Sequence, residues 1–153
     1  MISQYARLIC LFFLLVVPLI ALSGNDIDQH RSCVRCGMDR KAYGYSRMLI
    51  HYEDGTEIGA CSLHCAVLEL DSHPDRPVRN IYVADRSTHE LIDAKQAVWI
   101  IGGNKRGVMT PVPKWAFEKQ VNANAFVNSY GGKIVTWEEV FAATRREIAE
   151  NGK

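Results

Sequence analysis

The sequence predicts an α+β protein built from two small ββαβ units that pack together, followed by a C-terminal helix. The first unit is indicated by a hairpin pattern at residues 47–61, which is followed by a helical apolar stripe and another strand pattern. A similar order of elements recurs from residue 97 onward, with negligible sequence identity between the halves. Neither unit alone buries much core, so we expect the two units to pack against each other.

The first unit begins with the hairpin. Asp54-Gly55 is a preferred pair for a tight hairpin turn, and a strand-like run lies on each side of it. Ser62 can cap the following helix, because a serine hydroxyl can accept a hydrogen bond from the first helical turn. We expect this helix to end at Pro74, and residues 79–84 have the composition of a strand.

The second unit begins with a predicted strand at residues 97–102, and residues 107–112 are expected to form its return strand. A helix is predicted over residues 114–130, because apolar residues recur there at helical spacing. Gly131-Gly132 can end this helix, since glycine easily adopts the left-handed conformation that such an end requires, and a short strand follows.

The C-terminal helix has a start signal of its own. Thr136-Trp137-Glu138-Glu139 fits a capping box, in which the first and fourth side chains bond each other's backbone N–H groups. We expect the helix to run to about Glu150.

Residues 1–23 predict a signal peptide or a membrane anchor. Residues 8–22 form an uncharged apolar run that follows a single charged side chain, Arg7. The flanks and length fit a signal better than a membrane span, which needs about 20 apolar residues, and Ala21-Leu22-Ser23 offers small residues at a cleavage site. Cleavage and retention as an anchor both stay open. Both place residues 24–153 outside the cytoplasm, in the periplasm or on the outer face of the membrane.

Residues 24–32 are polar and unpatterned, and we expect them to be a linker to a domain at residues 33–153, with subunits divided at about residue 94. Without Arg7 the exported part carries 17 basic and 17 acidic residues. No basic stripe is present to neutralise phosphates, so nucleic-acid binding is not expected. Nucleophile, phosphate-loop and metalloprotease motifs are absent from the sequence, which predicts a protein that is not an enzyme.

Four cysteines outside the apolar run carry the candidate chemistry. They form a C-x2-C pair and a C-x3-C pair separated by 24 residues: Cys33, Cys36, Cys61 and Cys65. A turn can supply the first pair and the start of a helix the second, so that four thiolates converge on one tetrahedral ion. Disulfides and free thiols are the alternatives, since small exported proteins often pair their cysteines.

The identity of the metal depends on the soft ligands nearby. Zinc readily takes four thiolates, whereas Cu(I) prefers soft sulfur and also accepts methionine thioether. Met38 lies two residues after Cys36, and Met109 lies in the second unit. Either methionine can equally be a core residue, and His64, inside the second cysteine pair, is either another ligand or a surface side chain.

Short motifs follow one another in a characteristic order over roughly residues 33–140. They are Cys36-Gly37-Met38, Asp54-Gly55, Tyr82-Val83-Ala84-Asp85, Ile92-Asp93-Ala94, Ala97, Met109, Ala116-Phe117, Ala125-Phe126, Gly131-Gly132 and Trp137-Glu138. In this order they resemble the NosL family of copper-binding accessory proteins of nitrous oxide reductase maturation. Each motif is short, and their ordered coincidence is the specific signal.

The resemblance implies a pair of ββαβ units, a fold also seen in organomercurial lyases, and an exported, membrane-attached protein. It implies Cu(I) bound by sulfur, with Cys36 and Met109 as the natural ligands. In function it implies a chaperone that passes copper to a periplasmic enzyme such as nitrous oxide reductase, or that works with a copper transporter. The alternatives are a structural zinc module for protein interaction and a thiol oxidoreductase or lyase-like enzyme.

Two features depart from the family pattern. Typical members are lipoproteins with an acylated cysteine directly after the signal, whereas Ser23-Gly24 occupies that region here and Cys10 lies too early. The two cysteine pairs also exceed the single cysteine of the C-G-M motif, and they resemble treble-clef metal knuckles. The full set of candidate metal ligands is Cys36, Met109, Met38, Cys33, Cys61 and Cys65.

Overall fold

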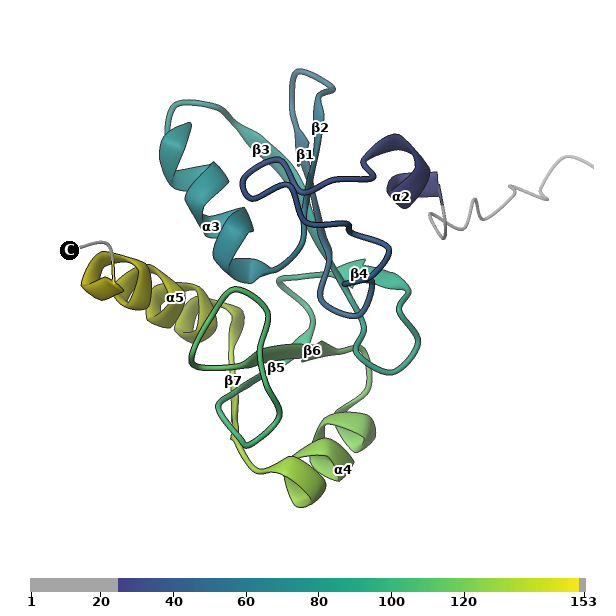
Figure 1. The fold of residues 1–153 in the computed structure, drawn as a ribbon, viewed down its shortest axis with the longest axis vertical. Coiled ribbons are helices and arrows are strands. Elements are labelled where there is room, and N and C mark those ends of the chain that lie inside the picture. Colours follow the sequence, from purple (N-terminus) through teal and green to yellow (C-terminus); the bar gives the residue numbers. More distant parts are fainter. Residues whose placement is uncertain (1–24, 152–153) are drawn as a thin grey trace, which may run out of the picture.

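The structure, a computed structural model, describes residues 25–151, so the predicted signal or anchor segment lies outside the described residues. In chain order the elements are α2 (Asn25–Gln29), β1 (Met48–Tyr52), β2 (Glu57–Ala60), α3 (Leu63–Ser72), β3 (Val78–Ala84), β4 (Leu91–Asp93), β5 (Val98–Ile101), β6 (Lys114–Phe117), α4 (Gln120–Tyr130), β7 (Lys133–Val135) and α5 (Trp137–Asn151). The orders β1-β2-α3-β3 and β5-β6-α4-β7 confirm the two predicted ββαβ units (Figure 1).

Each unit contributes its own antiparallel sheet. The first sheet has the strand order β2-β1-β3-β4, and the second has the order β6-β5-β7. The hairpin between β1 and β2 turns at Gly55, whose φ of 86° lies in the region that glycine adopts without strain. Strand β4 was not predicted, because its three residues are too few to show a pattern, and it extends the edge of the first sheet.

One hydrophobic core joins the two units. It combines strand residues of the first sheet, such as Met48 and Val83, with Trp99 of β5 and Val140 of α5. The neighbouring Ile100 belongs instead to a second cluster with Phe126 of α4. Because successive strand residues point to opposite faces, α5 and α4 cover opposite faces of the second sheet. The shared core confirms that the two units pack together.

The second unit differs from the prediction at its return strand. Residues 107–112 form a loop, and the return strand is β6, which pairs with β5 so that Lys114 lies opposite Ile101. The helix predicted over residues 114–130 therefore begins only at Gln120. All four β6 residues are buried, so strand pairing and burial override the helical spacing that continues into this segment.

Two of the predicted helix signals have different outcomes. Ser62 occupies the position before α3, but its side chain makes no capping hydrogen bond. The capping box of α5 is confirmed: the Thr136 N–H donates to Glu139 Oε2 at 2.8 Å, and the Glu139 N–H donates to Thr136 Oγ1 at 3.3 Å. Within residues 25–151, no helix has the length and apolar character to cross a membrane.

Candidate metal centre

The four cysteine sulfurs form one cluster. The Sγ atoms of Cys33, Cys36, Cys61 and Cys65 all lie within 4.8 Å of one another. Cys36 Sγ is 3.5 Å from Cys61 Sγ, which is 3.7 Å from Cys65 Sγ. All four cysteines are free, three of them are buried, and Cys36 is exposed. The two sequence pairs therefore make one site with a single exposed residue, Cys36.

A tight turn presents the first pair. The Cys33 N–H donates to the Met38 carbonyl, and the Gly37 N–H donates to the Cys33 carbonyl, both at 2.9 Å. Gly37 has a φ of 75°, a conformation that costs side-chain-bearing residues energy. The glycine of the C-G-M motif thus lets the chain reverse so that the sulfurs of Cys33 and Cys36 join the same cluster.

The second pair lies where β2 meets α3. Cys61 directly follows β2, and Cys65 is the third residue of α3. The free N–H groups at a helix start favour negative charge, so this position suits a thiolate. The Val34 N–H donates to the Gly59 carbonyl at 3.0 Å, which ties the turn of the first pair to the strand that leads into the second.

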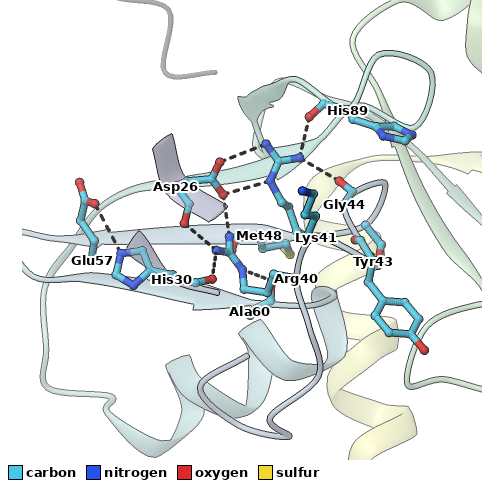
Figure 2. A network of polar contacts seen from close by, with 12 residues as sticks. Asp26, His30, Arg40, Lys41, Tyr43, Gly44, Met48, Glu57, Ala60 and His89 are labelled. Atoms are coloured by element: carbon cyan, nitrogen blue, oxygen red, sulfur yellow. Dashed lines mark hydrogen bonds and ion pairs between the residues drawn. The ribbon is translucent and has the colours of Figure 1, made fainter. Parts of the chain in front are cut away.

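A fully buried arginine holds the two cysteine segments together. Figure 2 shows Arg40, which follows the first pair in the sequence, at the centre of a network that includes Ala60, next to the second pair. Its guanidinium donates to the carbonyls of Ala60 at 3.1 Å and Met48 at 2.9 Å. Ala60 directly precedes Cys61, so Arg40 fixes the spacing between the two pairs.

The N-terminal segment completes this network. Asp26 in α2 is buried, and its carboxylate accepts hydrogen bonds from Arg40 at 2.8 Å and from Arg47 at 3.0 and 3.1 Å. Arg40 also donates to the carbonyl of His30 at 2.7 Å. Residues 25–32 are therefore part of the folded domain, in contrast to the predicted linker.

Sequence reasoning missed Asp26 and Arg40 for a physical reason. Both charged residues lie in stretches without apolar periodicity, and charged side chains are ordinarily exposed unless they find partners. The partners here are 14 residues apart and have no characteristic spacing. No sequence signal could have located the network.

The thiols titrate as a group. Hydrogen bonds from Cys61 and Cys65 hold the pKa of Cys33 well below its usual range, although burial acts in the opposite direction. The interaction with Cys33 is also the main reason why the pKa of Cys61 is raised to about 12, and the pKa of Cys65 is raised as well. Because metals bind thiolates, an ion must displace the protons that Cys61 and Cys65 retain.

The size of the cluster matches a tetrahedral site. Four thiolates about 2.3 Å from a zinc ion lie roughly 3.8 Å from one another. Two of the sulfur separations, 3.5 and 3.7 Å, are close to that spacing, and no separation exceeds 4.8 Å. An all-sulfur donor set suits Zn²⁺ and Cu(I), the two ions considered from the sequence.

The two candidate methionines line one cleft, although Met38 also packs against the core cluster that contains Cys33. Met38 and Met109 both line a cleft of about 510 Å³, and no cysteine lines it. Met109 is exposed and has a φ of 57°, which is uncommon for a side-chain-bearing residue. His64 also stays outside the sulfur cluster: it lines a separate hollow with Lys114.

A sequence model of the NosL family matches residues 25–144, which is most of the chain and includes all four cysteines. This chain belongs to the NosL family. The NosL match begins in α2, in agreement with the buried position of Asp26.

A known structure has the same fold. The crystal structure of the copper chaperone NosL from Shewanella denitrificans is similar with a TM-score of 0.59 and 24% sequence identity. The similarity covers 74% of this chain and 91% of that chain. No curated protein matches the sequence.

Proposed function

We propose that this NosL-family chain binds one Cu(I) ion at the four-cysteine centre and passes it to a recipient copper protein. The observation that carries the proposal is the sulfur cluster, in which four Sγ atoms lie within 4.8 Å and Cys36 alone is exposed. Soft sulfur ligands favour Cu(I). Membership of the NosL family and the structural similarity to a copper chaperone support this metal.

The geometry suggests the order of ligand exchange. An incoming thiolate or thioether reaches the ion beside Cys36 first, because the other three cysteines are buried. The bond between copper and Cys36 breaks as the bond between copper and the partner's ligand forms. The bonds from copper to the three buried sulfurs are then exchanged in the same way. The cleft between Met38 and Met109 supplies thioethers, which are weaker neutral ligands suited to a transient stop during transfer.

The biological setting belongs to the same proposal. The apolar run at residues 8–22 supports export and attachment to the outer face of the membrane. The recipient is a periplasmic copper enzyme such as nitrous oxide reductase, as the family resemblance implies. The chain holds and transfers its cargo without catalysing a reaction of its own.

Anaerobic titration with Cu(I) against a coloured chelator tests the binding step. We expect about one Cu(I) per chain at high affinity, loss of this affinity with Cys36→Ser, and weaker binding with Met109→Leu. Val34→Ala is the matched control, because Val34 is exposed on the same turn as Cys36. Unchanged uptake in Cys36→Ser would show that the assignment of the site is wrong.

A structural zinc site is the second candidate function. The near-tetrahedral sulfur spacing and the three buried thiols favour it, because closed four-thiolate sites are typical of zinc. In that case the cluster stabilises an interaction module and exchanges no cargo. Metal analysis of protein purified from its native compartment separates the two functions.

A further inference from the structure

A second hollow is lined by residues between 86 and 130, which follow both cysteine pairs in the sequence. It has a volume of about 400 Å³ and is formed by α4 together with the loops that follow β3 and β5. Three aromatic rings in series line it: the Phe117 and Phe126 centroids are 5.3 Å apart, and those of Phe126 and Tyr130 are 4.8 Å apart. Phe117 and Phe126 are buried beneath the hollow, and the exposed Tyr130 offers the accessible ring of this aromatic floor.

Two cations line the same hollow, and no carboxylate does. The Lys105 ammonium lies 4.5 Å from the Tyr130 ring centroid, and the Arg86 guanidinium lies 4.9 Å from that of Tyr45. Within residues 25–151 neither cation forms an ion pair, and the buried Nε of Arg86 has no hydrogen-bond partner. A partly buried cation without a counter-ion is costly, so this pair is suited to receive an anion.

The hollow adjoins the methionine cleft. Tyr45, which packs against Arg86, lines that cleft together with Met38 and Met109. The loop that carries Lys105 continues through Arg106, which also lines the cleft. A partner held at the hollow would therefore lie next to the methionines.

We propose that this hollow docks an acidic segment of a partner protein that carries an aromatic side chain between carboxylates. The ring enters the aromatic floor, where edge-to-face packing is favourable, and the carboxylates pair with Arg86 and Lys105. Charge complementarity is the basis for this choice, because the exported part of the chain has no net charge whereas the hollow has two unpaired cations. The proposal goes beyond copper binding and stands without it.

Fluorescence anisotropy with the full chain and a labelled peptide, Asp-Glu-Phe-Asp-Glu, tests the proposal. We expect saturable binding that weakens in high salt, and a loss of about tenfold in affinity with Lys105→Glu. Arg86→Gln gives a second reading, and circular dichroism checks that this variant folds. Lys95→Glu is the matched control, because it reverses an exposed positive charge that does not line the hollow.

The control probes separate the alternatives. The amide peptide Asn-Gln-Phe-Asn-Gln and the alanine peptide Asp-Glu-Ala-Asp-Glu should both bind at least several-fold more weakly. Equal binding by wild type and Lys105→Glu overturns the proposal, as does a loss in Lys95→Glu equal to that in Lys105→Glu. Binding of anionic lipid vesicles through Lys105 and Arg86 without peptide binding would assign the hollow to a membrane surface instead. Cu(I) titration of the same variants should be unchanged, whether or not the copper proposal holds.

Discussion

Cys36 differs from the other three cysteines because its side chain is exposed while theirs are buried. Burial raises the cost of leaving a thiolate without its ion, so the buried three favour a loaded site. The exposure of Cys36 lets a ligand from a partner protein approach the ion, so this cysteine allows the metal to be released. Under the proposed function, the exposure of Cys36 is what allows the site to transfer its metal rather than only store it.

The buried carboxylate of Asp26 should contribute strongly to the stability of the fold. Replacing Asp26 with Asn leaves Arg40 and Arg47 buried without their negative partner, which costs about 3–5 kcal/mol in related cases. Chemical denaturation should show this loss of unfolding free energy at neutral pH. Asp28→Asn, in the same helix but exposed, is the control and should change stability by less than about 0.5 kcal/mol.

The same residue predicts a pH dependence. Burial alone would raise the pKa of Asp26, but hydrogen bonds and charges of Arg47 and Arg40 together hold it below the ordinary value of 3.8. As pH falls through 3.8, the unfolded state takes up the proton first, so the contribution of Asp26 to stability is present above this pH and lost below it. The stability difference between wild type and Asp26→Asn should therefore shrink in acid. A constant difference down to the lowest pH would contradict this account.

Sequence patterns predicted helices, strands and turns correctly where local chemistry decides the structure. Asp54-Gly55 predicted the hairpin, and Thr136 with Glu139 predicted the start of α5. Both predictions were correct because turn and cap residues interact with backbone groups no more than four positions away. Strand β6 was misassigned as helix because its strand state depends on pairing with β5, which no local pattern reports. The four cysteines could be grouped from spacing, whereas the arginine network that positions them could not.

Gly59 links the fold of β2 to the metal centre. A side-chain carbon at this position would lie 2.6 Å from His30 Cβ and 2.8 Å from Arg40 Cζ. Gly59→Ala should therefore displace Arg40, cost about 1–3 kcal/mol in stability and weaken Cu(I) binding. Thermal unfolding and Cu(I) titration measure the two effects.

Gly55→Ala is the control for this variant. Its added carbon meets nothing within 4 Å, although its φ of 86° makes the turn strained, so stability falls by about 1 kcal/mol while metal affinity is kept. Unaltered Cu(I) affinity in Gly59→Ala would show that the position of Arg40 does not control the site.

The whole molecule should unfold as one unit, because one core joins both sheets. Trp99 and Trp115 lie in the second unit and Trp137 lies in α5, so no tryptophan belongs to the first unit and their fluorescence reports the second unit and the C-terminal helix. Far-UV circular dichroism reports the helices and strands of both units. In urea the two signals should show the same midpoint, and separate midpoints would mean that the units fold independently.

Metal exchange tests whether the sulfur cluster holds an exchangeable Cu(I) ion. The chain is loaded with one equivalent of zinc, one equivalent of Cu(I) is added without oxygen, and released zinc is measured with a coloured indicator. We expect one zinc ion to be released for each Cu(I) ion bound, and we expect the bound Cu(I) to move then to a competing thiol ligand. If zinc stays bound and the added Cu(I) is not taken up, the copper proposal is wrong and the cluster is a structural zinc site.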